Sequence, residues 1–336
     1  MKKVFFVCLL ACSLALISTM VIVGCNDDDG SPGGYIDTAF QNYGAQDYIN
    51  WLPREMPDAR IAYLNNFSLA YGDLRIPKTN RLRTTAGYPV MVVLHGGGWS
   101  QLITLDCIAP FAEALTDFGI ATWNIEFRRL GNPEGGYPGT LQDVGAAIDY
   151  LRVLAPEYNL DLSRVIVLGH SSGGHLALWA AGRHTIPSTS PLYVANPLPI
   201  KGVVDFGGIA NMETAYAGGR ADMWTFLGVT TTVEADLLYP TVSPYHMLPI
   251  GVPTSHFVGS LDAQWRIDGI HQYADEAIAL GTEAHVYDTP GANEFDLIDP
   301  CGPAWPTIVT EVHWILEAPQ PTGNLNRSKF CPVNGR

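Results

Sequence analysis

Short, continuous runs of apolar residues recur through the middle of the chain, with helical stretches or long loops between them. Runs of this length are typical of strands buried on both faces, as in a parallel sheet. Between the second and third runs, Leu141, Val144 and Ile148 share one face of a predicted helix. Strands that alternate with helices predict an α/β fold, with a mostly parallel central sheet flanked by helices. The predicted strands are residues 88–94, 120–127, 164–168, 200–206, 254–258 and 283–287.

Residues 207–249 interrupt this alternation and are rich in Tyr, Trp, Met, Thr and Pro. A parallel sheet carries its ligand site at the carboxyl ends of its strands, where the connecting loops meet. We therefore expect residues 207–249 to form a lid or wall over such a site. The domain is expected to span residues 59–318, followed by a C-terminal tail at residues 319–336.

The first residues have the pattern of a targeting segment. Lys2 and Lys3 precede an apolar run that ends at Val23, and Cys25 follows directly before a polar stretch. This pattern resembles a bacterial lipoprotein signal, which implies removal of residues 1–24 and lipid attachment to the sulfur of Cys25. An uncleaved single-span anchor is the alternative. Both predict that residues 25–58, a flexible tether and N-terminal segment, attach the domain to a membrane of the bacterial cell envelope, facing the periplasm or the cell surface.

Charge and cysteine content narrow the possible partners. The chain has 19 basic and 33 acidic residues and a formal net charge of −14, which argues against nucleic acid or an anionic bilayer surface as its main partner. The cysteine and histidine spacings are not those of a zinc site, so no metal is expected. In an exported chain, Cys301 and Cys331 could form a disulfide that fixes the C-terminus, with Cys107 left as a buried thiol. Two other pairings are possible.

Ser171 lies in the sequence Gly-His-Ser-Ser-Gly-Gly at residues 169–174, between a predicted strand and a helix-like stretch at residues 175–181. A G-x-S-x-G sequence in this context is typical of a nucleophile elbow, a strained turn that exposes the serine hydroxyl. An ordinary glycine-rich turn is the alternative. The context predicts that Ser171 is a nucleophile.

A second glycine-rich loop follows the first predicted strand, with the sequence His-Gly-Gly-Gly-Trp at residues 95–99. The negative oxygen of a tetrahedral intermediate in acyl transfer requires N–H donors. An elbow supplies one donor from the residue after the serine, here Ser172, and Gly97 or Gly98 would supply the second. A glycine turn that only packs against the sheet is the alternative.

The two loops, in this order, resemble the α/β-hydrolase superfamily, in particular its branch of bacterial esterases and arylformamidase-like (kynurenine formamidase-like) hydrolases. The resemblance covers residues 61–316 and includes residues 123–129, 136–140 and 295–300. It implies the α/β-hydrolase fold and hydrolysis of a small-molecule carboxylic ester or small aryl amide through an acyl-enzyme. It implies no cofactor.

The resemblance also implies a catalytic triad in the chain order Ser, acid, His. Asp262 follows the predicted strand at residues 254–258, where the family places the acid, and Asp268 is the alternative. The histidine of the family lies in a loop Gly-Ala-Gly-His-Phe-Asp. The matching residues here, 291–296, carry Glu294 in place of that histidine. Candidates for a substitute base among the histidines, all of which lie outside this loop, are His95, His170, His175, His285 and His313.

Glu294 leaves two hypotheses open. A solvated carboxylate, with a pKa of about 4.3, is a poorer base than imidazole at neutral pH. If Asp262 faces Glu294, the two carboxylates would share a proton, which could raise one apparent pKa toward neutrality and give a usable base. Otherwise turnover is attenuated or lost. The leading hypothesis is an attenuated serine hydrolase, and the alternative is a catalytically silent relative that binds an acyl or aromatic ligand at the cell surface.

Overall fold

A computed structural model of the chain describes residues 55–65 and 68–319. Within these residues, eight strands form one sheet: β1 (Ala59–Ala62), β2 (Tyr71–Arg75), β3 (Tyr88–Leu94), β4 (Ala121–Ile125), β5 (Leu160–His170), β6 (Gly202–Phe206), β7 (Thr254–Gly259) and β8 (Ala284–Thr289). Their order is β1-β2-β4-β3-β5-β6-β7-β8. The strands from β3 to β8 run parallel, and β1 and β2 extend one edge antiparallel.

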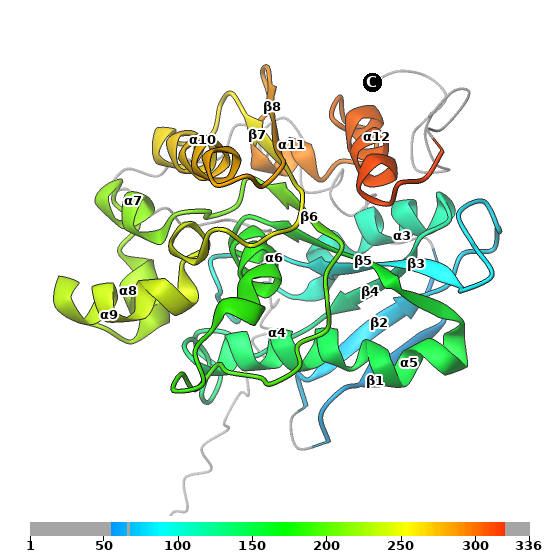
Figure 1. The fold of residues 1–336 in the computed structure, drawn as a ribbon, viewed down its shortest axis with the longest axis horizontal. Helices are drawn as coiled ribbons and strands as arrows, with labels where there is room; N and C mark the ends of the chain where they lie inside the picture. The colour runs from blue at the N-terminus through cyan, green and yellow to red at the C-terminus, as the bar shows by residue number, and fades with distance from the viewer. Residues whose placement is uncertain (1–54, 66–67, 320–336) are drawn as a thin grey trace, which may run out of the picture.

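Helices cover both faces of this sheet (Figure 1). Helices α3 and α12 pack on one face, whereas α4, α5 and α6 pack on the other. The helices are η1 (Leu105–Ile108), α3 (Ala109–Asp117), α4 (Gly139–Asp149), α5 (Leu151–Tyr158), α6 (Ser172–Gly182), η2 (Arg183–Thr185), α7 (Met212–Ala217), α8 (Asp222–Leu227), α9 (Thr232–Val242), η3 (Pro244–Met247), α10 (Gln264–Ala279), α11 (Glu294–Leu297) and α12 (Trp305–Ile315).

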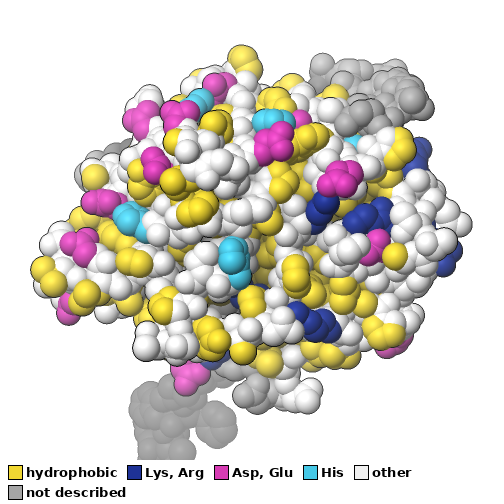
Figure 2. All heavy atoms as spheres, viewed as in Figure 1, with side chains coloured by type: hydrophobic (Ala, Val, Ile, Leu, Met, Phe, Trp, Pro, Cys, Tyr) yellow, Lys and Arg dark blue, Asp and Glu magenta, His cyan; other side chains and the backbone are white. Residues whose placement is uncertain are grey.

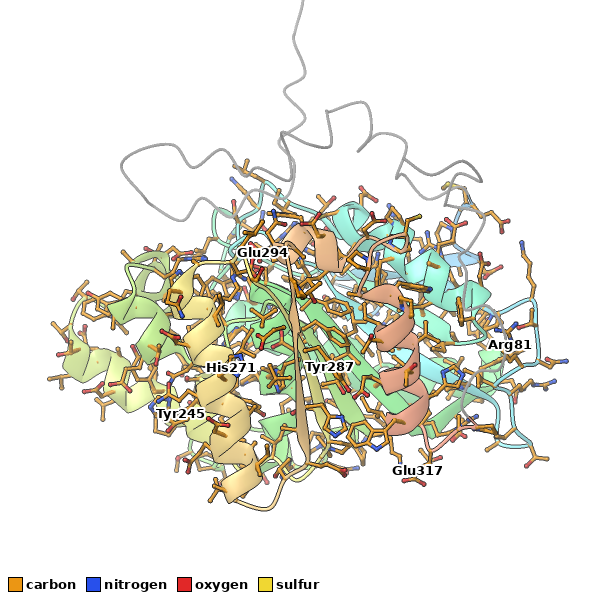
Figure 3. All side chains as sticks on the ribbon, turned by 90° about the horizontal axis from the view of Figure 1, so that it is seen from above. Arg81, Tyr245, His271, Tyr287, Glu294 and Glu317 are labelled. Atoms are coloured by element: carbon orange, nitrogen blue, oxygen red, sulfur yellow. The ribbon has the colours of Figure 1, made fainter. Side chains whose placement is uncertain are left out.

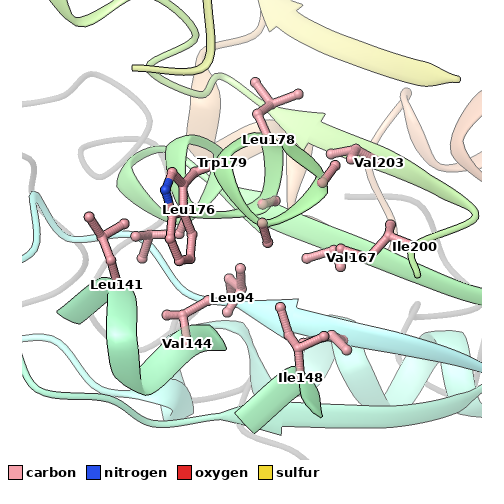
Figure 4. Packing of buried hydrophobic residues seen from close by; sticks show 14 of the residues in the cluster. Leu94, Leu141, Val144, Ile148, Val167, Leu176, Leu178, Trp179, Ile200 and Val203 are labelled. Carbon is pink, nitrogen blue, oxygen red and sulfur yellow. The ribbon is translucent and has the colours of Figure 1, made fainter. Parts of the chain in front are cut away.

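Strand β3 shows why an unbroken apolar run is needed at the centre of the sheet. Val90, Val92 and Leu94 belong to the cluster formed with α4 and α6, part of which is shown in Figure 4. Met91 and Val93 belong to the cluster formed with α3 and α12. Successive side chains of a strand point to opposite faces, so a strand covered on both faces favours an unbroken apolar run.

The predicted α/β-hydrolase fold is confirmed. Each of the six predicted strands overlaps one of the parallel strands β3 to β8, and Leu141, Val144 and Ile148 lie fully buried on α4. The antiparallel strands β1 and β2 lie outside the prediction. Residues of β1 alternate between half-buried and exposed, so this short edge strand has no continuous apolar run that would mark it in the sequence.

Residues 207–249 form an insertion between β6 and β7 that contains α7, α8, α9 and η3. Phe226 on α8 is buried and stacks on Trp99, with 4.5 Å between ring centroids. Trp224 stacks on Tyr216 within the insertion, with ring centroids 4.1 Å apart. The insertion thus packs on the loop that follows β3, at the carboxyl edge of the sheet.

One cysteine prediction is wrong. Cys107 is half-buried and disulfide-bonded, so it is not a buried free thiol, and Cys301 is disulfide-bonded as well. Cys107 lies on η1, a short helix in which the preceding residue Asp106 is exposed, so its sulfur is not enclosed in the core. Cys331 and the proposed lipid-attachment residue Cys25 lie outside the described residues.

On the face shown in Figure 2, acidic side chains are most frequent toward the α8–α9 end, and most Lys and Arg side chains lie on the opposite part. In the part of the chain that the structure describes, no helix is both long and apolar enough to cross a membrane. That part also brings no three His, Cys, Asp or Glu side chains together as a set of metal ligands.

The packing of α12 gives a prediction for stability. Trp305 is buried and contacts the ring edges of Phe111 and Phe118 at 5.2 and 5.4 Å between centroids. Trp305→Ala should lower the free energy of unfolding by about 3–5 kcal/mol, because it leaves a large cavity between α3 and α12. Urea denaturation measures the change. Leu280→Ala, at a position that is 46% exposed, is the control and should cost less than about 0.5 kcal/mol; equal losses in the two variants would contradict the packing argument.

Candidate active site

The carboxyl end of β5 turns sharply into α6 at Ser171, whose backbone has φ 52° and ψ −119°. This left-handed conformation is strained for a residue with a side chain. Close backbone approach makes the turn possible: a Cβ atom on Gly169 would lie 2.0 Å from the carbonyl oxygen of Gly173. A Cβ atom on Gly173 would lie 2.3 Å from the carbonyl oxygen of Leu94, at the end of β3. The glycines therefore let the serine turn fit against the neighbouring strand.

The glycine-rich loop after β3 lies directly against this turn. Gly97 and Gly98 have φ values of 105° and 58°, and the backbone N–H of Trp99 donates to Ser172 Oγ at 3.2 Å. Among the described residues, the N–H groups of Gly97 and Gly98 have no hydrogen-bond acceptor. The N–H of Ser172 lies in the first turn of α6, where a helix offers no acceptor of its own. The N–H groups of Gly97 and Gly98 are thus without an acceptor among the described residues, in the loop that contacts the serine turn through Trp99 and Ser172.

A buried charged cluster holds the glycine-rich loop in place. His95 Nε2 lies 3.2 Å from Glu126 Oε1, and Arg129 Nη2 lies 3.0 Å from the same carboxylate. His95 also stacks on Phe127, with 4.5 Å between ring centroids. Burial would raise the pKa of Glu126, but His95 and Arg129 outweigh it and hold that pKa below its usual value. Residues 123–129, which carried part of the family resemblance, thus contribute the support of this loop.

Asp262 follows β7 and lies close to the backbone of Glu294. Its Oδ1 accepts the N–H of Glu294 at 2.8 Å, and its Oδ2 accepts the N–H of Gly259 at 2.8 Å. The alternative acid, Asp268, is exposed on α10 and accepts a hydrogen bond from Gln264 at 2.7 Å. The structure therefore brings Asp262, and not Asp268, to the loop that carries Glu294.

Glu294 begins α11 at the carboxyl edge of the sheet, and it lies at the opposite end from Glu317 in Figure 3. Its side chain is buried and forms a two-pronged ion pair with Arg266: Nη2 to Oε1 at 3.0 Å and Nη1 to Oε2 at 2.5 Å. The contact that the structure gives the Glu294 carboxylate is thus with Arg266, and the sharing of a proton with Asp262 stays a prediction. The guanidinium of Arg266 compensates the carboxylate of Glu294, whereas Asp262 binds the Glu294 backbone.

Arg266, on the first turn of α10, is the site residue that sequence reasoning missed. Its Nη1 lies 3.3 Å from Ser171 Oγ and also donates to the carbonyl oxygen of Gly207. The guanidinium carbon lies 4.9 Å from the ring centroid of Trp265. We call Arg266, with its contacts to Ser171, Gly207 and Glu294, the Arg266 bridge. No sequence motif indicates Arg266, because its proximity to Ser171 depends on where the fold places α10.

The other histidines have structural partners. His170 Nε2 lies 3.7 Å from Glu294 Oε2, so this ring flanks the ion pair. Burial lowers the pKa of His175 to about 4, and its Nε2 bonds the carbonyl oxygen of Val242 at 2.8 Å. His285 lies on β8, remote from Ser171, and its Nδ1 lies 2.8 Å from a carboxylate oxygen of Glu311. Burial lowers the pKa of His313 on α12.

Comparison with known proteins identifies the family. A family model described as BD-FAE matches residues 73–257, more than half of the chain. The chain therefore belongs to the BD-FAE family, and its fold is that of the α/β-hydrolase esterases. The matched residues contain both the glycine-rich loop and the serine turn, whereas the loops of Asp262 and Glu294 lie beyond them.

Individual relatives agree with this assignment. Carboxylesterase NlhH of Mycobacterium tuberculosis is 38% identical over 90 residues, which are 26% of this chain and 27% of that protein. The non-reducing polyketide synthase Preu3 of Preussia isomera is 35% identical over 106 residues, 29% of this chain and 4% of that protein. This chain thus spans well under two thirds of either relative. A solved structure, a truncated carbohydrate esterase from gut microbiota, has a TM-score of 0.65 at 20% identity and covers 79% of this chain and 99% of its own.

The buried cluster under the glycine-rich loop gives a pH-dependent prediction. Glu126→Gln should lower the free energy of unfolding by about 3 kcal/mol at neutral pH, because Arg129 loses its buried counter-ion. The folded-state pKa of Glu126 lies below its ordinary value of 4.5, so the contribution of the carboxylate is present above that value and is lost as the pH falls through the lower folded-state value.

The difference between native chain and variant, measured by urea denaturation against pH, should therefore shrink in acid. Glu317→Gln, which changes an exposed carboxylate paired with Lys201, is the matched control and should leave stability unchanged. A difference for Glu126→Gln that stays constant down to acid pH would show that lost packing, and not lost charge, destabilises the variant.

Proposed function

We propose that this chain is a serine hydrolase of carboxylic esters or small aryl amides that acts through an acyl-enzyme with strongly attenuated turnover. The observation that carries the proposal is the strained Ser171 turn beside the available N–H groups of Gly97, Gly98 and Ser172. Ser171 Oγ would attack the carbonyl carbon, and these N–H groups would bind the carbonyl oxygen as it becomes negative. Similarity to a carboxylesterase supports an ester as the substrate.

We expect attenuated turnover because the site lacks an effective acceptor for the Ser171 hydroxyl proton. In each half of the reaction, a base must accept a proton from the attacking hydroxyl or water and return one to the leaving group. Glu294 stands in the loop where the family has its histidine, but its carboxylate is already paired with a guanidinium. A neighbouring cation stabilises the ionised carboxylate and so makes it a weaker proton acceptor. Loss of this acid–base help costs about 10²- to 10⁴-fold in rate.

One observation favours a second candidate function. Arg266 donates to Ser171 Oγ, the atom that must approach the base during attack. A serine held in this way is consistent with a catalytically silent relative that binds an acyl or aromatic ligand in the same site. Such a protein would use the N–H groups beside Ser171 to bind the carbonyl or carboxylate of its ligand.

Turnover of short-chain nitrophenyl esters distinguishes the two functions. The native chain should hydrolyse them slowly, with Ser171→Ala reducing the rate to that of solution, because the nucleophile is lost. Ser188→Ala, at an exposed serine 17 residues after Ser171, is the control and should retain the native rate. Identical rates for the native chain and Ser171→Ala would contradict the serine-hydrolase proposal. Binding of a ligand without turnover would then favour the catalytically silent relative.

We also propose, from the sequence, that residues 1–24 are removed and that Cys25 carries a lipid in the cell envelope. Expression in a bacterium fed a labelled fatty acid should yield a labelled, membrane-associated native chain. Cys25→Ser should be unlabelled, because the acceptor sulfur is absent. A native chain that stays unlabelled but keeps residues 1–24 and remains in the membrane would instead support an uncleaved anchor.

A further inference from the structure

One nitrogen atom of Arg266 contacts both Ser171, the proposed nucleophile, and Glu294, which stands where the family has its catalytic histidine. Nη1 of Arg266 lies 3.3 Å from Ser171 Oγ and 2.5 Å from Glu294 Oε2, and it also donates to the carbonyl oxygen of Gly207. Ser171 Oγ thus accepts a hydrogen bond from a permanent cation at a lone pair, whereas a general base would accept the hydrogen of the same hydroxyl. Arginine cannot accept a proton at any pH at which the protein is folded.

The position of Arg266 is fixed from several sides. Its side chain is 4% exposed, its guanidinium packs on the ring of Trp265, and Glu294 holds it with two contacts. Two-pronged pairs between a guanidinium and a carboxylate are directional as well as strong. Arg220 lies near the same Trp265 ring at 5.3 Å, but its guanidinium pairs with Asp222. Arg220 therefore matches Arg266 in burial and aromatic contact, and its contacts within the described part of the chain include those with Asp222 and Trp265.

We propose that Arg266 is a positioning residue that holds Ser171 and Glu294 in an unreactive arrangement. This inference rests on the proposed serine hydrolase. Its turnover would be attenuated by the positive charge of Arg266 as well as by the missing imidazole. A histidine at position 294 would have to become an imidazolium during the reaction. A guanidinium in contact with that position disfavours a second positive charge, so the histidine alone would be a poor base.

The same arrangement predicts what Glu294 does when the cation is removed. Among the described residues, the charged or titratable groups that contact Glu294 include Arg266 on α10, His170 at the end of β5, and Asp262, which accepts its backbone N–H. Without Arg266, burial and Asp262 both disfavour the carboxylate anion. Glu294 would then titrate closer to neutrality, where a carboxylate is a more effective general base.

The test compares kcat/KM for nitrophenyl esters in Glu294→His, Arg266→Gln and the double variant, each with labelling of Ser171 by a fluorophosphonate probe. Glu294→His should stay within about 10-fold of the native chain, whereas the double variant should gain about 10²- to 10³-fold, the range of general acid–base catalysis. The double variant removes both members of the ion pair and leaves neither charge buried alone, so it remains informative if Arg266→Gln fails to fold.

Three further measurements separate positioning from a merely structural role. Arg266→Gln should show a rate that rises with pH as Glu294 loses its proton. Arg266→Lys combined with Glu294→His keeps the positive charge and should stay as slow as Glu294→His. Arg220→Gln combined with Glu294→His is the matched control and should also equal Glu294→His.

The outcomes distinguish this inference from the function on which it rests. If Glu294→His alone reaches the rate of the double variant, the missing imidazole explains the attenuation and the role assigned to Arg266 is wrong, while the serine hydrolase stands. If the probe labels Ser171 in no variant, including a folded double variant, both the hydrolase and the role of Arg266 are overturned.

Discussion

Close approach of the Ser171 turn to the end of β3 is the constraint on which the site depends. Gly173 packs against the backbone of Leu94, and Trp99 of the next loop donates to Ser172. These contacts fix the proposed nucleophile and the proposed oxyanion donors relative to each other. The sheet makes the approach possible because β3 and β5 are adjacent and parallel, so their carboxyl ends lie side by side.

Buried charges surround this turn, and each has a partner. Glu126 is paired with His95 and Arg129 beneath the glycine-rich loop, and Glu294 is paired with Arg266 above the serine. Burying an ion pair recovers little stability, because the desolvation penalty is comparable to the attraction between the charges. Such pairs are better explained by the geometry they impose. The first pair supports the glycine-rich loop, and the second holds the guanidinium that contacts Ser171 Oγ.

Much of the fold could be predicted from the sequence, because each central strand is covered on both faces and therefore needs an apolar run that is visible without any structure. The two antiparallel strands at the edge lack that signal, since β1 has only one partly covered face and β2 carries the buried polar residues Asp73 and Arg75. The sequence also did not predict that Cys107 is disulfide-bonded. Exposure of a cysteine in a short surface helix depends on how that helix lies on the sheet, which local pattern does not specify.

The sequence by itself determined the local chemistry: a serine in a strand-to-helix glycine turn, a glycine-rich loop after an earlier strand, and Glu294 in the loop of the missing histidine. These are short-range features, set by residues adjacent in the chain. Only the tertiary structure decided the partner of Glu294. Arg266 lies 28 residues before Glu294 and 95 after Ser171, and α10 brings its guanidinium to both. Coulombic interactions act through space, so the identity of a counter-ion is a property of the folded chain and not of its motifs.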